Sequence, residues 1–301
     1  MDALKFKTTM SFSYGVPSEM GPGVARIVAD NPGPFTFKGT NTYLVGTRAL
    51  AVIDPGPDDA RHCAAILAAS AGRPITHILV THTHRDHVDG LARLKAATGA
   101  RSCGHVRSEA SRGTIAASPS GRDFVDLDFS PDLTMADGDA VEGDGFTLTA
   151  VHTPGHAPDH LCFALEGSGL LFSGDHVMAW NTSVIAPPEG RMSDYIGSLE
   201  KLLTRDDRVL LPGHGGRIEE PQRTARAYLI HRRWREQAVM DAVRAGAETI
   251  RKIVPVVYPG LDGRLAMAAA LSVQAHVEHL IDRGLLSCHG HPTFDRPLSA
   301  A

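Results

Sequence analysis

The segment of residues 81–87 constrains this chain most, because it reads Thr-His-Thr-His-Arg-Asp-His and lies between two contrasting stretches. Residues 75–80, directly before it, form a short and mostly apolar run, which predicts a buried strand. Residues 88–97 after it carry Leu91 and Leu94 on one side, which predicts a helix. A loop that follows a strand is where a rigid scaffold presents side chains for chemistry. We therefore expect this segment to form part of a functional site.

Four side chains in this segment are potential metal ligands. His82 and His84 are two residues apart, so in extended backbone they point the same way and can share one ion. Asp86 and His87 follow where the chain turns into the helix, and they can face a second ion. Neutral imidazole and carboxylate are the usual ligands of zinc-like ions. Packing alone hardly explains such a cluster, so we expect a metal site.

Three later motifs each add one candidate ligand at the end of a predicted strand. They contain His156 in Thr-Pro-Gly-His, Asp175 in Ser-Gly-Asp and His214 in Pro-Gly-His-Gly. Each ligand lies beside a glycine, which permits an otherwise strained turn. Each motif is weak alone, but together with the first segment they supply seven ligands.

In this order the four motifs resemble those of the metallo-β-lactamase superfamily, over about residues 20–218. The resemblance implies an α/β (α+β) fold, the αββα sandwich, with a binuclear metal site at one edge. It also implies the ligand sets, which are His82, His84 and His156 for the first ion, Asp86, His87 and His214 for the second, and Asp175 bridging both.

Details within the superfamily narrow the function. True zinc β-lactamases usually lack an aspartate at the position of Asp175, and flavodiiron proteins usually have glutamate in place of His84, so both are disfavoured. The remaining resemblance is to the glyoxalase-II-like and LACTB2-like branches. Residues 31–43 and the C-terminal region are similar to the LACTB2-like group, which includes single-strand-specific endoribonucleases.

We expect an enzyme, a hydrolase in which two zinc ions hold a hydroxide between them at neutral pH, although manganese or iron would suit the same ligands. Asp86 is the candidate catalytic residue, because its carboxylate could also hold or shuttle a proton of the nucleophile. The first hypothesis is hydrolysis of an ester or thioester in a small-molecule metabolite. The alternative is a phosphodiesterase or endoribonuclease acting on single-stranded RNA. A DNA-binding regulator is less favoured, because residues 265–283 lack a clearly basic face.

Other residues near the motifs have weaker assignments. Asp54 ends a predicted strand and is a candidate to support the metal-binding loop, as an aspartate there often does in the superfamily, or a simple turn former. Residues 31–40 form either a lid or an ordinary surface loop. Candidates for substrate binding follow the Asp175 motif, and they are Asn181, Thr182 and Ser183. Four further histidines could support ligands but are more simply packed or exposed, and they are His77, His152, His160 and His176.

Short apolar runs alternate with Gly- and Pro-rich turns through residues 1–218, which favours two sheets with helices outside them. The predicted strands are residues 41–46, 50–53, 75–80, 147–152, 161–165, 170–173 and 208–212. The predicted helices are residues 59–71, 88–97 and 195–203.

The composition of the chain changes after Gly216, because residues 219–245 are nearly free of glycine and proline. Helices are predicted over residues 219–245, 247–254 and 265–283, followed by a possible hairpin within residues 284–294. These are the parts of a winged-helix module. We therefore predict a catalytic domain over residues 1–218 and a helical winged-helix-like domain over residues 219–301, which either shapes the cleft or mediates a homodimer. Within the basic segment of residues 231–235, we expect Trp234 to pack inward behind a solvated arginine face.

The bulk composition limits the partners. A net charge of −4 gives no reason to expect attraction of the whole molecule to nucleic acid or to an anionic membrane. No secretory signal or membrane-spanning run is visible, and the four cysteines form no paired motif. We expect a reduced, cytoplasmic protein with no membrane partner.

Overall fold

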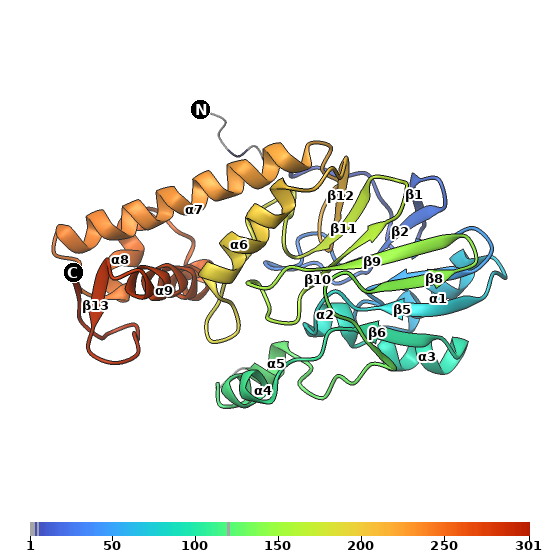
Figure 1. Cartoon of the computed structure of the whole chain (residues 1–301), viewed down its shortest axis with the longest axis horizontal. Coiled ribbons are helices and arrows are strands. Elements are labelled where there is room, and N and C mark those ends of the chain that lie inside the picture. The colour runs from blue at the N-terminus through green and yellow to red at the C-terminus, as the bar shows by residue number, and fades with distance from the viewer. Residues whose placement is uncertain (1–3, 5, 119–120) are drawn as a thin grey trace.

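The computed structural model describes residues 4, 6–118 and 121–301, and its core is a sandwich of two sheets with helices on both outer faces (Figure 1). Within these residues the first sheet has the order β1-β2-β3-β4-β5-β6-β7 and the second has the order β12-β11-β10-β9-β8. This confirms the expected αββα sandwich. The strands of the first sheet are β1 Ser18–Gly21, β2 Val24–Val28, β3 Asn41–Val45, β4 Leu50–Ile53, β5 Ile75–Leu79, β6 Arg101–Gly104 and β7 Leu133–Thr134. Those of the second are β8 Ala140–Gly143, β9 Phe146–His152, β10 Leu161–Leu165, β11 Leu170–Gly174 and β12 Val209–Pro212.

The strands divide their side chains between separate apolar layers, because successive residues of a strand point to opposite faces. In β4, Ala51 and Ile53 face the second sheet, whereas Leu50 and Val52 face outward. The outer face of the first sheet is covered by α1 (Ala60–Ser70) and α3 (Leu91–Thr98). The outer face of the second sheet is covered by α6 (Met192–Leu203) and the first half of α7 (Pro221–Arg244).

The candidate ligands follow strands that end at one edge of the sandwich. In the second sheet β10 pairs antiparallel with both β9 and β11, and β11 pairs parallel with β12. β9, β11 and β12 therefore run the same way, and their carboxyl ends meet. The loop after β5 in the first sheet reaches the same place.

The helix predicted over residues 88–97 is interrupted. The chain forms the short helix α2 (Arg85–Val88), turns at Gly90 and starts α3 at Leu91. Gly90 packs directly against the turn after β4, since its N–H donates to the Gly56 carbonyl and an added Cβ would lie 2.7 Å from the Pro55 carbonyl oxygen. The tight contact explains the break, which the apolar spacing of the sequence does not reveal.

Other boundaries also differ from the prediction. α6 starts three residues early, at Met192, and the helix predicted over residues 247–254 is α8 (Ile250–Val257), which contains Pro255. The Thr249 side chain caps α8 by accepting from the Lys252 N–H. The terminal hairpin extends further than expected. The sequence also did not predict most of α2, the short 3-10 helix Gly263–Leu265, or the elements β1, β2, β6, β7, β8, α4 (Glu109–Ala116) and α5 (Gly121–Phe124).

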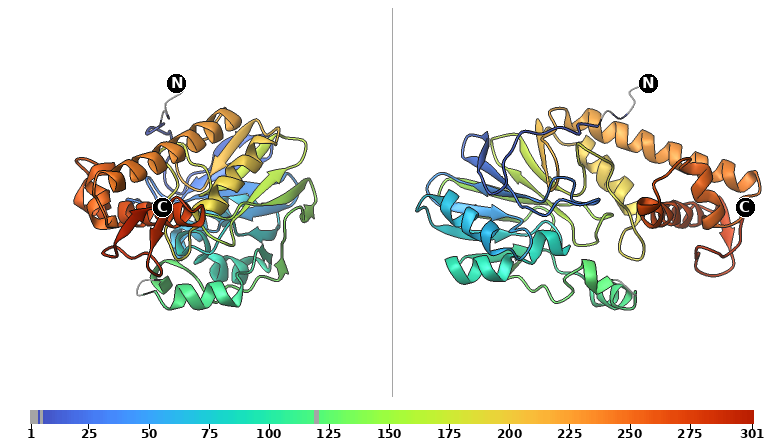
Figure 2. Two further views of the ribbon diagram at one scale, coloured as in Figure 1. Left: turned by 60° about the vertical axis from the view of Figure 1, so that its left-hand side comes forward. Right: turned by 180° about the vertical axis from the view of Figure 1, so that it is seen from behind.

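The C-terminal region forms its own apolar core beside the sandwich (Figure 2). The second half of α7 packs there with α8, with α9 (Ala266–Asp282) and with the hairpin of β13 (Leu286–Cys288) and β14 (Leu298–Ala300). The helix α7 thus belongs to both cores and joins them. The predicted boundary between residues 218 and 219 stays a prediction.

The prediction for Trp234 was wrong. Trp234 is 49% exposed, and Arg232 is buried with 2% of its surface accessible. Two residues are about 200° apart around a helix, so these side chains face opposite ways. Arg232 lies inside because its guanidinium donates to the buried Ser183 carbonyl. No helix of the described chain is both long and apolar enough to cross a bilayer.

Candidate metal centre

The three histidines of the first predicted ligand set meet at one point. The His82 Nε2 lies 2.9 Å from the His84 Nδ1, and the His156 Nε2 lies 3.1 Å from the same atom. His82 and His84 come from the loop after β5, and His156 from the loop after β9. The two sheets therefore contribute jointly to this group.

The second predicted set meets beside the first. The Asp86 Oδ2 lies 3.3 Å from the His87 Nε2 and 3.2 Å from the His214 Nε2. The two histidine Nε2 atoms are 3.2 Å apart. All three side chains thus offer a ligand atom to one small volume.

Asp175 lies between the two groups. Its Oδ1 is 3.6 Å from the His87 Nε2, and its Oδ2 is 3.3 Å from the His214 Nε2 and 3.8 Å from the His156 Nε2. Gly213 packs against it, because an added Cβ there would lie 2.6 Å from the Asp175 Oδ1. The carboxylate is therefore held where it can reach both ligand groups.

The outward ring nitrogen of each of the five histidines faces an oxygen atom. These oxygens belong to the Thr81 hydroxyl for His82 (3.0 Å), Glu189 for His84 (2.9 Å), Asp54 for His87 (2.9 Å), the Val184 carbonyl for His156 (2.7 Å) and the Gly39 carbonyl for His214 (3.2 Å). An N–H donated outward leaves the lone pair of the other nitrogen pointing into the cluster. Metal-binding histidines are characteristically oriented in this way.

The electrostatics of the cluster also suit a cation. Burial lowers the pKa of His82 and of His156 below the ordinary value of 6.5, so both favour the neutral form that binds metals. Burial acts in the same direction on His87 and His214, but the carboxylates of Asp86 and Asp175 outweigh it and raise both pKa values, that of His214 to about 9. Buried carboxylates that attract protons onto these imidazoles would equally attract divalent ions.

One carboxylate atom supports the same fit. The Asp175 Oδ1 is buried, and it has no hydrogen-bond partner among the described residues. A buried polar atom without a partner is costly unless a ligand or ion satisfies it. The chain's own residues therefore fit a pair of metal ions with nitrogen and oxygen ligands.

Asp54 supports the loop that carries four of the ligands. Its Oδ1 accepts from the Thr81 N–H at 2.7 Å, and its Oδ2 accepts from the Thr81 hydroxyl at 2.8 Å and from the His87 Nδ1 at 2.9 Å. Asp54 itself is 2% exposed and adopts a positive φ of 53°. The carboxylate thus fixes both the start of the loop and the orientation of a ligand.

The loop of residues 31–40 contacts the second ligand group directly. The Thr40 hydroxyl donates to the Asp86 Oδ2 at 3.1 Å, and the Gly39 carbonyl accepts from His214. Phe37 in this loop stacks on Trp180, with ring centroids 4.9 Å apart and planes at 10°. The loop therefore forms a wall of the site and helps to fix two of the ligands.

A buried ionic network that no sequence motif marks contacts His84. The Glu189 carboxylate contacts His84 and an Arg107 Nη2 at 2.5 Å. Arg107 also pairs with Asp159 at 2.8 Å, and Asp159 accepts from the backbone and hydroxyl of Thr83. Burial would raise the pKa of Glu189, but His84 and Arg107 together lower it to about 2, so the carboxylate is charged. These three residues lie in separate loops with no shared motif, so no sequence signal marked them.

The predicted substrate residues differ in their placement. The Asn181 side chain is exposed and Thr182 is half-buried, so both are available at the surface of the loop after Asp175. Ser183 is 1% exposed and its hydroxyl donates to the His176 carbonyl at 2.8 Å. The Ser183 hydroxyl is therefore paired inside the protein and is not exposed to a substrate.

The four other histidines named in the sequence analysis lie in different surroundings. His160 lies beside the cluster, where its Nε2 accepts from the Asp175 N–H at 3.1 Å. His176 packs against Tyr195, with ring centroids 5.0 Å apart. His77 packs against Phe146 and His152 against His105, outside the ligand groups. Of these four, only His160 touches a candidate ligand among the contacts of the described residues.

Comparisons with known families agree with this geometry. Residues 35–214 match the family described as the metallo-beta-lactamase superfamily. Residues 249–291 match the beta-lactamase associated winged helix domain. The winged-helix expectation for the C-terminal region is thus confirmed.

The chain is similar in sequence to proteins that are named as lactamase-like, as beta-lactamase-like or as a thioesterase. The chain is 32% identical to a beta-lactamase-like protein 2 homolog of Drosophila melanogaster, over 87% of this chain and 89% of that protein. It is 32% identical to an atrochrysone carboxyl ACP thioesterase of Aspergillus fumigatus, over 75% of this chain and 66% of that protein. A lactamase-like protein of Pestalotiopsis microspora is 31% identical, and the match spans 65% of its length.

Solved structures resemble both the whole chain and its sandwich. A metallo-beta-lactamase family protein from Thermus thermophilus is 25% identical and superposes with a TM-score of 0.75, over 94% of this chain and 100% of that one. The protein TTHA1623, solved in a di-iron-bound form, is 25% identical with a TM-score of 0.51, over 64% of this chain and 93% of that one.

Proposed function

This chain belongs to the metallo-beta-lactamase superfamily, and on that premise we propose that it is a binuclear zinc hydrolase acting on an ester or thioester of a small metabolite. The observation that carries the proposal is the arrangement of two three-residue ligand groups with Asp175 between them. The di-iron form of TTHA1623 supports two ions in a related sandwich. Zinc is the ion we propose for this chain.

The proposed ligand sets are those implied by the sequence. His82, His84 and His156 would hold one ion, Asp86, His87 and His214 the other, and Asp175 would contact both. When bound, two such ions lower the pKa of a shared water toward about 7 and polarise the oxygen of the substrate. The Thr40 hydroxyl donates to the Asp86 Oδ2 and orients this carboxylate, whose other oxygen would be the one to take up a proton of the nucleophile.

The walls of the site would position the substrate. The stacked pair of Phe37 and Trp180 offers an apolar face on one side, and Asn181 and Thr182 offer polar groups next to it in the sequence. The thioesterase from Aspergillus fumigatus supports an acyl substrate, because its name states that activity in a relative that is 32% identical.

Phosphodiester cleavage in single-stranded RNA is the second candidate. The same residues would hold ions of a kind that supports attack of water on phosphorus as well as on carbon. The observation that favours RNA is the exposed Trp234 on α7, because exposed aromatic side chains provide stacking surfaces for unpaired bases.

An assay of zinc-loaded protein on a panel of acyl thioesters and on short single-stranded RNA distinguishes the two candidates. We expect turnover of at least one thioester and no RNA cleavage above that of a chelator-treated sample. RNA cleavage that requires zinc, without any thioester turnover, would reject the ester or thioester proposal in favour of the second candidate.

Glu189 provides a test of the first ligand group. A Glu189→Gln variant removes the charge that orients His84, and changes of this kind typically weaken metal affinity by about 10–100-fold. Zinc titration in competition with a chromogenic chelator should show this loss for one of two ions. Glu200→Gln on the exposed face of α6 is the matched control. Equal affinities in both variants would contradict a role for Glu189 in orienting the ligand.

A further inference from the structure

The loop of residues 176–191, between Asp175 and α6, fixes two of the proposed ligands from outside. The Val184 carbonyl accepts from the His156 Nδ1 at 2.7 Å. The Glu189 carboxylate contacts the His84 Nε2 at 2.9 Å. The conformation of this loop therefore affects the orientation of His84 and His156, two of the three side chains in the first ligand group.

The helix α7 holds this loop through two buried polar side chains. The Tyr228 hydroxyl lies 2.6 Å from the carbonyl oxygens of both Met178 and Asn181, and it accepts from the Met178 N–H at 3.2 Å. Arg232 donates to the Ser183 carbonyl at 2.5 Å, directly before Val184. Both side chains are almost fully buried, with exposures of 0% and 2%.

Arg232 also reaches the start of the loop through a second contact. Its guanidinium lies over the ring of Tyr195, 5.0 Å from the centroid. The Tyr195 hydroxyl donates to the His176 carbonyl at 2.8 Å, one residue after Asp175. Buried loop carbonyls need donors, and an apolar helix face would leave them without any. The polar groups of α7 thus provide donors for the buried carbonyls of the loop.

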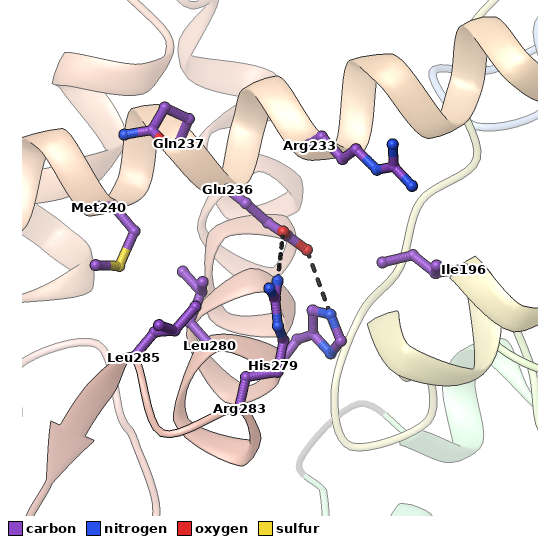
Figure 3. Close-up of a pocket in the computed structure, with 9 residues that line it drawn as sticks. All are labelled: Ile196, Arg233, Glu236, Gln237, Met240, His279, Leu280, Arg283 and Leu285. Atoms are coloured by element: carbon purple, nitrogen blue, oxygen red, sulfur yellow. Dashed lines mark hydrogen bonds and ion pairs between the residues drawn. The ribbon is translucent and has the colours of Figure 1, made fainter. Parts of the chain in front are cut away.

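The face of α7 that carries Tyr228 and Arg232 continues to the C-terminal core. Tyr228, Arg232 and Glu236 are spaced four residues apart, which places them on one face of the helix. Glu236 lies 3.1 Å from Arg283 and 3.4 Å from the His279 ring nitrogen (Figure 3). Glu236, His279 and Arg283 line a cavity of about 440 Å³ where α6, α7 and α9 meet. One helix face therefore contacts the site loop at one end and α9 at the other.

We propose that Tyr228 and Arg232 are positioning residues for the metal centre, through which the C-terminal region holds the loop of residues 176–191 in its ligand-orienting conformation. The inference rests on the proposed metal centre for its effect on function. The contact between α7 and the loop does not depend on any metal, so the two parts can be tested separately.

Arg232→Met is the main test variant, because it keeps most of the side-chain length and removes the donor to Ser183. We expect faster amide hydrogen exchange in residues 176–191 of the metal-free protein and roughly tenfold weaker zinc affinity at one site. The absorption spectrum of the cobalt-substituted protein should also change, because the geometry of His156 depends on this loop. Arg232→Lys, which keeps a donor, should restore part of each property.

The control is Arg233→Met, the exposed neighbour on the same helix. Tyr228→Phe removes a single hydroxyl and serves if Arg232→Met does not fold. The proposal is overturned if the loop exchanges equally in Arg233→Met and in the folded test variant. It is also overturned if exchange rises while zinc affinity and the cobalt spectrum stay unchanged. If the wild-type protein binds no metal, the proposed function fails, whereas the exchange result still shows whether α7 holds the loop.

Discussion

An Asp175→Asn variant should bind one metal ion per chain where the wild-type protein binds two, and its kcat/KM should fall by about 10³-fold or more. Asp175 is the only carboxylate among the described residues that lies within 4 Å of both a first-group and a second-group histidine. The amide keeps the size of the side chain but loses the negative charge that two adjacent cations require. Inductively coupled plasma mass spectrometry of the dialysed protein gives the metal count, and initial rates on the best substrate give kcat/KM.

Asp206→Asn is the matched control, because Asp206 is exposed and lies outside the ligand groups. It should keep two ions and the full rate. Two ions in Asp175→Asn with an unchanged rate would remove the central role that we assign to this carboxylate. A loss of both ions would show instead that Asp175 supports the whole centre.

Removal of metal by a chelator should lower the midpoint of thermal unfolding by roughly 10 °C. Ligand at about a thousand times its Kd stabilises a protein by about 4 kcal/mol, and each kcal/mol shifts the midpoint by about 2–4 °C in chains of 150–250 residues. The seven ligands join loops from both sheets, so ions bound there stabilise the whole sandwich. Differential scanning calorimetry of loaded and chelated protein measures the difference directly, with re-addition of zinc as the control.

The effect of chelation should grow between pH 6.5 and pH 9. In the metal-free protein the carboxylates of Asp86 and Asp175 overcome the burial of His214 and raise its pKa to about 9, compared with 6.5 when unfolded. A raised pKa contributes stability that is complete below pH 6.5 and is lost as the pH rises through about 9. The metal-free protein therefore loses stability over this range. The metal-bound protein does not, because the ions no longer have to displace a proton from His214. A difference in midpoint that stays constant or shrinks from pH 6.5 to pH 9 would contradict this account.

The sequence was sufficient for the fold and for the convergence of the seven candidate ligands. Both rested on the resemblance of the four motifs to the metallo-β-lactamase superfamily, which implied the αββα sandwich and the ligand sets. The residues alone placed His82, His156 and Asp175 each after a predicted strand, and the structure brings these side chains to one site.

The supporting contacts were not predictable in the same way. Arg107, Asp159 and Glu189 come from three loops that meet only in the folded chain. Arg232 was misjudged because a charged residue on a long helix is usually exposed, and its partner, the Ser183 carbonyl, is a backbone atom that no sequence motif marks. The break at Gly90 likewise depends on a distant turn. Long-range packing decided each of these features.

The loop of residues 31–40 has a consequence for how this enzyme can diversify. The same ten residues carry Phe37 at the wall of the site and also hold Asp86 and His214 through Thr40 and Gly39. Mutations that reshape this wall for a new substrate therefore also disturb a ligand group, and selection acts on both properties together. Asn181 and Thr182 have no such link to the ligands through their side chains in the described contacts. New specificities should thus arise by substitution there first, with changes in residues 31–40 following only where metal affinity is preserved.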